Sequence, residues 1–285
     1  MNKNNKIKAL LVRLVLWIIE LPIIRHFKHS CGDWRYLYLP FFWKLSNILV
    51  PRRLVIVGDV SFTLPCDNWI THFRWYLFKT KEVEVREYID NYVKDDDIFF
   101  DIGANIGVFS IYACKRHEKL KTYCFEPEYS NLHYLKENVI KNRLMDSINI
   151  YSVAVSNDDM ISMLNVQDLT PGAAVHTESK ENIEITDEGY DVVWREGIST
   201  ITLDRFCSEE NIFPDVMKID TDGNEAKILA GASNVLMNKK LRSIVLELPL
   251  DPTIAEQCVG LLKNAGFSLE WSRDDTRNQI WARSD

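Results

Sequence analysis

The stretch FFDIGANIGVFS, residues 99–110, decides the fold of this chain. The apolar run over residues 98–101 predicts a buried strand that ends in a carboxylate, Asp101, and residues 108–116 continue as a helix. Gly103 and Gly107 let the connecting backbone turn tightly, so that backbone N–H groups and the start of the helix face an anionic group. The segment therefore predicts a ligand site between this strand and this helix.

The loop differs from the dinucleotide-binding fingerprint, Gly-x-Gly-x-x-Gly. Asn occupies position 105 and Ile position 106, so the pattern here is Asp-x-Gly-x-Asn-x-Gly. A carboxylate at the strand end suits the cationic amino group of a methionine moiety. The departure argues against an NAD-dependent oxidoreductase.

A second acidic strand end lies in FEPE, residues 125–128. Glu126 closes a strand predicted over residues 122–126 and follows Asp101 by 25 residues. A carboxylate at this place can accept hydrogen bonds from both hydroxyls of a ribose. An acidic residue at the end of a strand is by itself often only exposed to solvent. Together with the preceding glycine-containing loop, however, Glu126 predicts a nucleoside site.

Strands alternate with helices from about residue 80, which predicts an α/β fold with a mostly parallel sheet between helices. The expected strands are 98–101, 122–126, 148–155, 216–220 and 243–248, and the expected helices are 83–93, 108–116, 130–142, 226–237 and 254–264. Two more strands, 267–271 and 279–282, are joined by a polar turn. We therefore expect a seven-stranded sheet with an antiparallel edge.

Residues 156–215 interrupt this alternation with strand-like pieces at 161–166, 183–185 and 199–202 and a turn at 171–172. An insertion of this length often covers an active site. Before the α/β region, residues 54–57 and 60–64 predict a short hairpin around Gly58.

Three carboxylates cluster in MKIDTDGNEAKILAGA, residues 217–232. Asp220 ends a strand beside the first strand, at the point where the sheet order reverses and ligands bind. Asp222 and Glu225 follow on a glycine-containing turn, and the three could neutralise a sulfonium, bind a metal or accept a proton. Alternatively, Asp222 or Asn224 caps a helix and Glu225 interacts with its dipole.

Asp222, Glu225 and His176 are the candidate catalytic residues, with Asp222 preferred as the base, and no metal ligand is assigned. His176 follows the turn at 171–172, from which it could reach an acceptor. Glu82 and Glu84 are competing bases.

The charge of the chain is uneven. The whole chain carries −7, but residues 1–80 hold twelve Lys/Arg and four Asp/Glu, a net +8. The acidic remainder has no excess of basic residues with which to bind nucleic acid. The chain also lacks the N/D-P-P-Y/F motif of nucleic-acid methyltransferases. Six cysteines without a CxxC pair predict neither a zinc site nor a disulfide framework.

Residues 9–24 are apolar except for Arg13 and Glu20. Sixteen helical residues rise only about 24 Å, short of the ~30 Å bilayer core. Lys6, Arg13 and Glu20 form one polar stripe, which favours a helix lying in the membrane interface; docking on the protein's own core is the alternative. Aromatic residues are concentrated at 34–43 and 69–78. They would either contact a membrane or a lipid-linked acceptor, or pack in the core.

The chain resembles the FkbM family of S-adenosylmethionine (SAM)-dependent methyltransferases over about residues 54–250. The stretches that carry the resemblance are KEVE (81–84), DIGANIGVFS (101–110), FEPE (125–128), NVIKN (138–142), AVSN (154–157), TLDRF (202–206) and KIDTDGNEAKILAGA (218–232). The family more often has Tyr-Glu-Pro-Glu where this chain has KEVE, and Glu-Gly where it has Asp222-Gly223.

The resemblance implies a Rossmann-like class I methyltransferase fold that transfers a methyl group from SAM to a hydroxyl. By this resemblance Asp101, Gly103, Asn105, Gly107 and Glu126 would hold SAM, and Asp220 would sit beside it. We expect Ala104, Pro127 and Asp220 to belong to the cofactor-binding residues as well. We expect an N-terminal extension at residues 1–80 and the methyltransferase domain at residues 81–285.

The predicted function is SAM-dependent O-methylation of a sugar hydroxyl in a glycan or glycolipid. The enzyme would be cytoplasmic and peripheral at the inner face of a membrane, in contact with it through residues 1–24. The alternatives are a methyltransferase of a small secondary metabolite and a non-catalytic membrane-associated adaptor with a methyltransferase-like fold.

Overall fold

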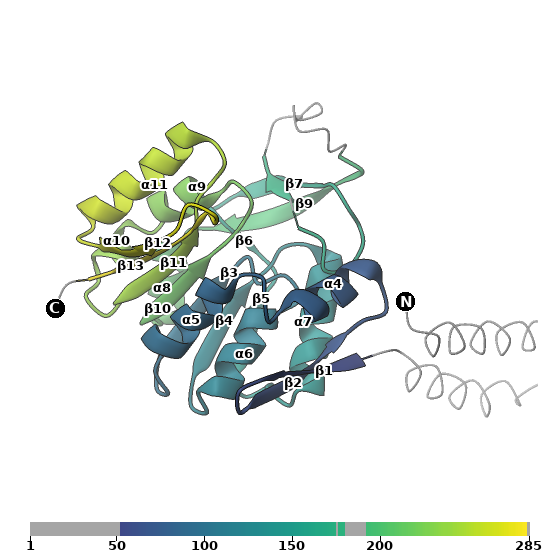
Figure 1. Cartoon of the computed structure of the whole chain (residues 1–285). Coiled ribbons are helices and arrows are strands. Elements are labelled where there is room, and N and C mark those ends of the chain that lie inside the picture. Colours follow the sequence, from purple (N-terminus) through teal and green to yellow (C-terminus); the bar gives the residue numbers. More distant parts are fainter. Residues whose placement is uncertain (1–51, 175, 180–191, 284–285) are drawn as a thin grey trace, which may run out of the picture. The chain divides into compact units, whose positions relative to one another are not determined.

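A central seven-stranded sheet organises the computed structural model, which describes residues 52–174, 176–179 and 192–283 (Figure 1). Its strand order is β12-β13-β11-β10-β3-β4-β5. The five parallel strands are β3 (Ile98–Ile102), β4 (Lys121–Phe125), β5 (Ile148–Tyr151), β10 (Val216–Ile219) and β11 (Ser243–Glu247). β12 (Ser268–Ser272) and β13 (Asn278–Ala282) add the antiparallel edge. The predicted mostly parallel sheet with an antiparallel edge is confirmed.

The sheet order reverses between β3 and β10. β3 pairs in parallel with β4 on one side and with β10 on the other, where Asp101 lies opposite Lys218. The carboxyl ends of these strands therefore open at one edge of the sheet, which is where ligands bind in doubly wound sheets. Asp220 follows β10 at this edge, as the sequence predicts.

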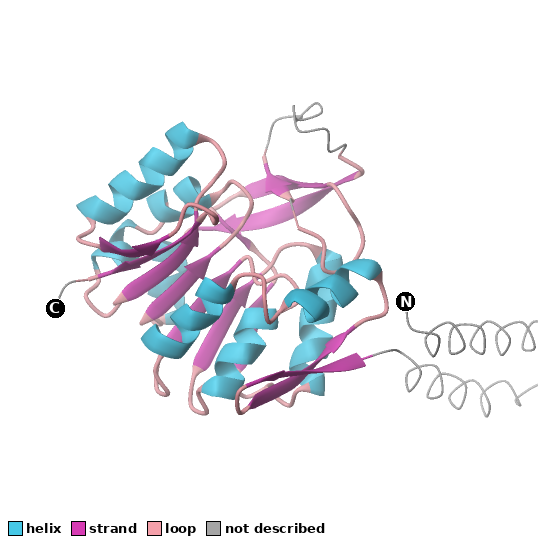
Figure 2. Ribbon diagram, in the orientation of Figure 1, coloured by secondary structure: helices cyan, strands magenta, loops and turns pink. Residues whose placement is uncertain are grey.

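Helices cover both faces of the sheet, as Figure 2 shows. Adjacent strand residues point to opposite faces, so Phe99 enters one core and Phe100 the other. The first core contains residues of α5 (Val83–Tyr92), α6 (Val108–Arg116) and α7 (Tyr129–Lys141). The second contains residues of α8 (Leu203–Glu210), α9 (Glu225–Ala230), α10 (Ser233–Met237) and α11 (Pro252–Asn264).

A hairpin and a helix precede the α/β region. The hairpin consists of β1 (Arg52–Val57) and β2 (Val60–Pro65), as predicted, and α4 (Trp69–Leu77) follows it. Asn68 begins α4 with a capping box, because its side chain accepts from the backbone N–H of Thr71 and its own backbone N–H donates to the Thr71 hydroxyl. The described residues at 53–64 and from 68 onward form one compact unit, in which Phe62 and Phe78 join the first core.

The strand predicted over residues 148–155 is two strands in the structure. β5 ends at Tyr151, and β6 (Ala154–Val155) belongs to a second sheet of order β6-β9-β7-β8. The other strands of that sheet are β7 (Ile161–Val166), β8 (Thr177–Glu178) and β9 (Trp194–Ile201). The chain leaves the central sheet at residues 152–153 because Ala154 and Val155 pair with β9 instead.

The helix predicted over residues 226–237 is also divided, into α9 and α10. Gly231 lies at the break, and a Cβ atom there would come within 2.2 Å of the backbone oxygen of Ser156. Glycine permits this close approach of the two backbones at the position where α9 ends. The insertion contains α8, which the sequence analysis did not predict.

Several predicted features lie outside the described residues. These are the helix at 9–24, the aromatic stretch at 34–43 and the strand-like piece at 183–185. Within the described part of the chain, no helix has the length and apolar character needed to cross a membrane.

Candidate functional site

The loop after β3 is fixed against both neighbouring strand ends. The backbone N–H groups of Gly103 and Ala104 donate to the carbonyl of Phe125, at 3.0 and 3.2 Å. Gly103 has a φ of +78°, and a Cβ atom there would come within 1.8 Å of the backbone oxygen of Asp220. Only glycine fits between these strand ends, so the loop holds one position over the sheet edge.

Glu126 lies next to this loop, at the end of β4. Its carboxylate is 5% exposed and accepts the backbone N–H of Asn105 at 2.8 Å and that of Glu128 at 3.0 Å. Burial raises the pKa of Glu126 to about 7, although both hydrogen bonds act to lower it. The two N–H groups fix the carboxylate, and its remaining lone pairs can accept further donors.

Seven of the eleven predicted cofactor and catalytic residues line one hollow at the carboxyl edge of the sheet, which we call the cleft pocket. Of the residues predicted from the sequence, those that line it are Gly103, Asn105, Glu126, Pro127, Asp220, Asp222 and His176. The predicted residues Asp101, Ala104, Gly107 and Glu225 are not part of its lining.

Asp101 faces a lysine that the sequence analysis missed. The Nζ of Lys218 lies 3.3 Å from the carboxylate of Asp101 and 3.3 Å from that of Asp220. Ser110 donates its hydroxyl to the other oxygen of Asp101. Burial acts to lower the pKa of Lys218, but the charges of Asp220 and Asp101 raise it, so the lysine stays protonated. Because Asp101 is 1% exposed and already paired, it supports the site through Lys218.

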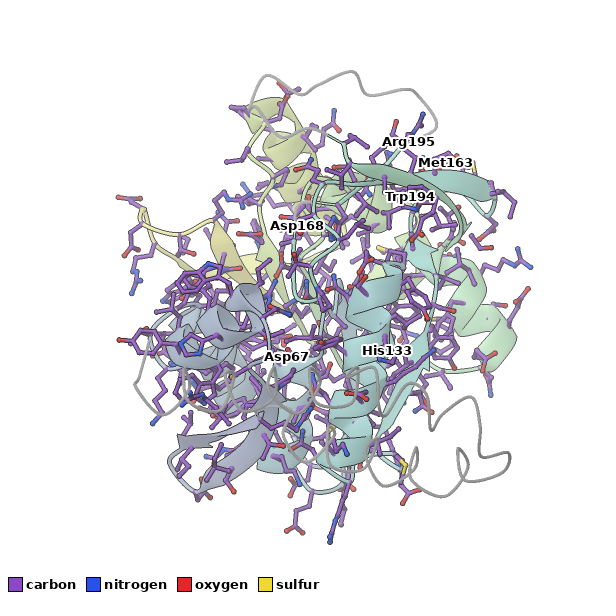
Figure 3. All side chains as sticks on the ribbon, turned by 90° about the vertical axis from the view of Figure 1, so that its right-hand side faces the viewer. Asp67, His133, Met163, Asp168, Trp194 and Arg195 are labelled. Atoms are coloured by element: carbon purple, nitrogen blue, oxygen red, sulfur yellow. The ribbon has the colours of Figure 1, made fainter. Side chains whose placement is uncertain are left out.

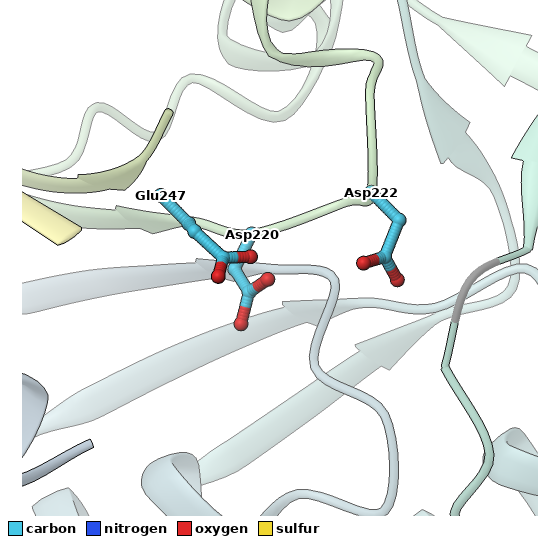
Figure 4. Close-up of side chains that lie close together, drawn as sticks. All are labelled: Asp220, Asp222 and Glu247. Carbon is cyan, nitrogen blue, oxygen red and sulfur yellow. The ribbon is translucent and has the colours of Figure 1, made fainter. Parts of the chain in front are cut away.

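Asp220 also meets a second residue that the sequence analysis missed, Glu247 at the end of β11. One oxygen of each of Asp220, Asp222 and Glu247 lies within 4.8 Å of the others (Figure 4). Burial and the charge of Asp220 raise the pKa of Glu247 to about 9. Burial acts to raise the pKa of Asp220, but the charge of Lys218 and a hydrogen bond from Glu247 lower it.

These opposite shifts favour the protonated form of Glu247 and the ionised form of Asp220, so that Glu247 can donate to Asp220. Nη2 of Arg277 lies 2.9 Å from Oε1 of Glu247. Three such carboxyl oxygens could also hold a hard cation. A proton on Glu247 accounts for the close approach of Glu247 to Asp220.

Glu225 is the first residue of α9 and holds the turn before it. Its carboxylate is 1% exposed and accepts from the N–H and hydroxyl of Thr221, each at 3.0 Å, and from the N–H of Gly223. These bonds occupy the carboxylate and present Asp222, whose φ is +55°, at the cleft pocket. The structure thus places Glu225 as a support for the turn that carries Asp222.

His176 reaches the cleft pocket from the insertion. Neither ring nitrogen has a hydrogen-bond partner within the described residues. Burial lowers the pKa of His176, although Glu128 and Asp168 act to raise it. A neutral imidazole at this place can accept a proton.

The insertion is fastened to the loop after β3. The side chains of Asn105 and Asn131 both donate to the carbonyl of Ala173, at 2.6 and 3.1 Å, and the N–H of Gly172 donates to Asn131 at 2.7 Å. Figure 3 shows Met163, Trp194 and Arg195 on the paired strands β7 and β9, and Asp168 on the loop between them and this turn. The insertion therefore contributes to the walls of the cleft pocket.

A second hollow, which we call the α4 pocket, shares Ala173 and Ala174 with the cleft pocket. Its other walls come from α4, from residues 81–82, from the start of α6 and from residues 167–168 of the insertion. Most of these side chains are apolar, and Arg74 is among the charged ones.

Comparison with known proteins identifies the family. The model of the FkbM methyltransferase domain matches residues 101–269, more than half of the chain. The chain belongs to the FkbM methyltransferase family. It is therefore a methyltransferase, and the family assignment made from the sequence is confirmed.

Two similar relatives are themselves methyltransferases. The chain is 24% identical over 203 residues to the 31-O-demethyl-FK506 methyltransferase FkbM of Streptomyces tacrolimicus, covering 64% of this chain and 76% of the relative. It is 27% identical over 188 residues to the hexuronic acid methyltransferase AglP of Haloferax volcanii, covering 62% of this chain and 66% of the relative.

Solved structures with a similar fold include an FkbM methyltransferase of Methylobacillus flagellatus KT. Its TM-score is 0.49 at 14% identity, covering 88% of this chain and 60% of that one. The FkbM domain of the present chain includes the loop after β3, Glu126, Lys218, Asp220 and Glu247, whereas α4 and α5 precede it.

Proposed function

We propose that this FkbM methyltransferase transfers a methyl group from SAM to a hydroxyl of a sugar in a glycan or glycolipid. The observation that carries this proposal is the fixed carboxylate of Glu126 beside the loop at Gly103. A ribose requires such an acceptor for its hydroxyls. Glu126 supplies it directly after β4, the strand that pairs with β3.

The residues present fit SAM. Glu126 has lone pairs for the ribose hydroxyls after it has accepted its two backbone N–H groups. Asp220, ionised and on the same pocket, can neutralise the cationic sulfonium or ammonium. Pro127 and Asn105 complete the wall. Buried Asp101 acts through Lys218, which fixes the position of Asp220.

When bound, SAM supplies a methyl group on a positively charged sulfur, a good leaving group. The chain must align an acceptor hydroxyl with that group and take up the hydroxyl proton. We assign the proton to Asp222, which Glu225 presents on the cleft pocket. His176 is the second candidate, because its neutral ring lies on the same pocket with both nitrogens available.

The sugar acceptor is supported by the hexuronic acid methyltransferase among the relatives. The relative that acts on demethyl-FK506 favours a small secondary metabolite as the alternative acceptor. A non-catalytic adaptor would need neither a fixed ribose acceptor nor a proton acceptor at the same pocket.

A peripheral position at an anionic membrane belongs to this proposal. On α4, Trp69, Phe73 and Tyr76 recur at i, i+4 and i+7, and Trp69 is 75% exposed. Trp and Tyr favour membrane interfaces, and the basic charge of residues 1–80 complements anionic lipid.

Incubation of the full chain with methyl-labelled SAM and lipid and glycan extracts of its host tests the function. We expect label in a saccharide or glycolipid fraction, and none with Asp222→Asn. Label in a small hydrophobic metabolite would favour the alternative acceptor. Absence of both label and SAM binding would favour the adaptor.

A further inference from the structure

Arg74 is a cation set into the mainly apolar α4 pocket. It lines this pocket together with Ile70, Phe73, Leu77 and Phe109. Its Nε donates to the carbonyl of Gly172 at 2.6 Å, which anchors the guanidinium at the turn that separates the two pockets. Two nitrogens of the guanidinium fork remain for a further acceptor, and the fork matches a carboxylate well.

Lys81, the other cation that lines the α4 pocket, pairs with Glu82 at 3.0 Å. Lys218, at the ends of the strands, lies between Asp101 and Asp220. Arg74 makes no ion pair within 4 Å to any residue that the structure describes, although the charges of Glu82, Asp220, Asp222 and Glu126 reach it. An arginine in such surroundings is a site for an anionic ligand group.

The position of the α4 pocket indicates which ligand supplies that group. The pocket begins where the loop after β3 ends, at Val108 and Phe109, and the Nζ of Lys218 lies 5.8 Å from the centre of the Phe109 ring. A ligand with its ribose at Glu126 and its cationic centre near Asp220 therefore extends its far end toward Arg74. In SAM that end carries a carboxylate beside the ammonium, and the acidic groups of the cleft suit only the ammonium.

We propose that Arg74 binds the carboxylate of the methionine moiety of SAM. This inference rests on the proposed function. It makes α4, which precedes the matched FkbM domain, a part of the cofactor site. The side chain of Asn68 donates to the carbonyl of Pro171 at 3.2 Å, so α4 and the insertion turn hold each other over the same ligand.

Calorimetric titration with two ligands tests this proposal. S-adenosylhomocysteine (SAH) carries the carboxylate, and its decarboxylated analogue, S-adenosyl-3-thiopropylamine, keeps the ammonium but lacks the carboxylate. For the full chain we expect SAH to bind about 10- to 100-fold more tightly than the analogue, as for a hydrogen-bonded charged group. Arg74→Gln should lose this factor for SAH and leave the affinity for the analogue unchanged.

Arg74→Lys keeps the charge and should recover part of the preference for SAH. Lys79→Gln, which removes an exposed charge near the end of α4, is the matched control and should behave like the parent. If Arg74→Gln lowers the affinities for SAH and for the analogue by the same factor, the proposal is overturned and Arg74 is a support for the turn at Gly172. Unchanged SAH affinity would also overturn it and assign Arg74 to the acceptor. Failure of the parent to bind either ligand would instead reject the proposed function.

Discussion

Asp220 and Glu247 lie next to each other at the ends of two adjacent parallel strands, and their pKa values are shifted in opposite directions, which favours one proton shared between them. Ile219 of β10 pairs with Leu246 of β11, which brings the two following residues together. Burial and the charge of Asp220 raise the pKa of Glu247 to about 9, and the charge of Lys218 keeps Asp220 ionised. Two charges of one sign at this distance would repel, and the proton removes that repulsion.

The shared proton makes the stability of the fold depend on pH. The folded protein holds the proton of Glu247 up to about pH 9, whereas an unfolded glutamate releases it near pH 4.3. The native state therefore binds more protons between these values, and the contribution of Glu247 falls as the pH rises, by at most about 1.4 kcal/mol per pH unit.

Glu247→Gln should remove this slope because an amide donates to Asp220 without titrating. We expect its free energy of unfolding to fall less than that of the parent between pH 7.5 and 9, above the pKa of Glu126. Urea unfolding in the presence of EDTA measures this without interference from divalent cations. Equal slopes for the two proteins would show that Glu247 is already ionised at neutral pH.

Lys218 should be a strong determinant of stability. Lys218→Met leaves two carboxylates beside an apolar side chain, and removing one partner of a buried ion pair costs about 3–5 kcal/mol. Lys119→Met is the control, since Lys119 makes only an exposed pair with Asp96 and should change the free energy of unfolding by less than about 0.5 kcal/mol.

A second substitution separates charge from packing at this site. Adding Asp101→Asn to Lys218→Met removes one unpaired carboxylate and should restore part of the lost stability. If the double variant is no more stable than Lys218→Met, the loss comes from packing and not from the uncompensated charge.

Asp222→Asn tests the assignment of the base. Loss of a general base lowers turnover by roughly 10²–10⁴-fold, while SAH affinity should stay near that of the parent, because Glu126 and Asp220 are unchanged. Single-turnover methylation and calorimetry on the same preparation measure the two quantities. His176→Phe, measured in parallel, identifies the base if Asp222→Asn turns over normally.

The local parts of the site could be predicted from the sequence. The strand, the loop with Gly103 and the helix after it follow each other within twelve residues, so their geometry depends on short-range rules. Glu126 and Asp220 could be placed because each directly ends an apolar run, and parallel strands open at the same edge.

The partners of these residues could not be predicted, because they depend on strand register. Lys218 meets Asp101 only because β10 pairs with β3 so that the two residues lie opposite each other. A lysine within the apolar run of residues 216–219 was the available signal, since a charge in a buried strand needs a partner. Glu247 gave a similar but weaker signal at the end of residues 243–247.

The irregular elements also needed the structure. The break between β5 and β6 follows from pairing with β9, some 45 residues further along the chain. The hydrogen bond from Arg74 to the carbonyl of Gly172 joins residues 98 positions apart. The pattern of apolar residues within either segment does not indicate such long-range contacts.

SAH titration of the parent, Glu126→Gln and Glu126→Ala from pH 6 to pH 8 tests the central claim most directly. The pKa of Glu126 is about 7 in the free protein, and only the ionised carboxylate accepts from both ribose hydroxyls. SAH should therefore bind the parent more tightly as the pH rises, and this dependence should vanish in Glu126→Gln. At pH 8, Glu126→Ala should lose roughly 1.5–3 kcal/mol of binding free energy. Equal SAH affinity in all three proteins, or no SAH binding by the parent, would contradict a SAM site at Glu126.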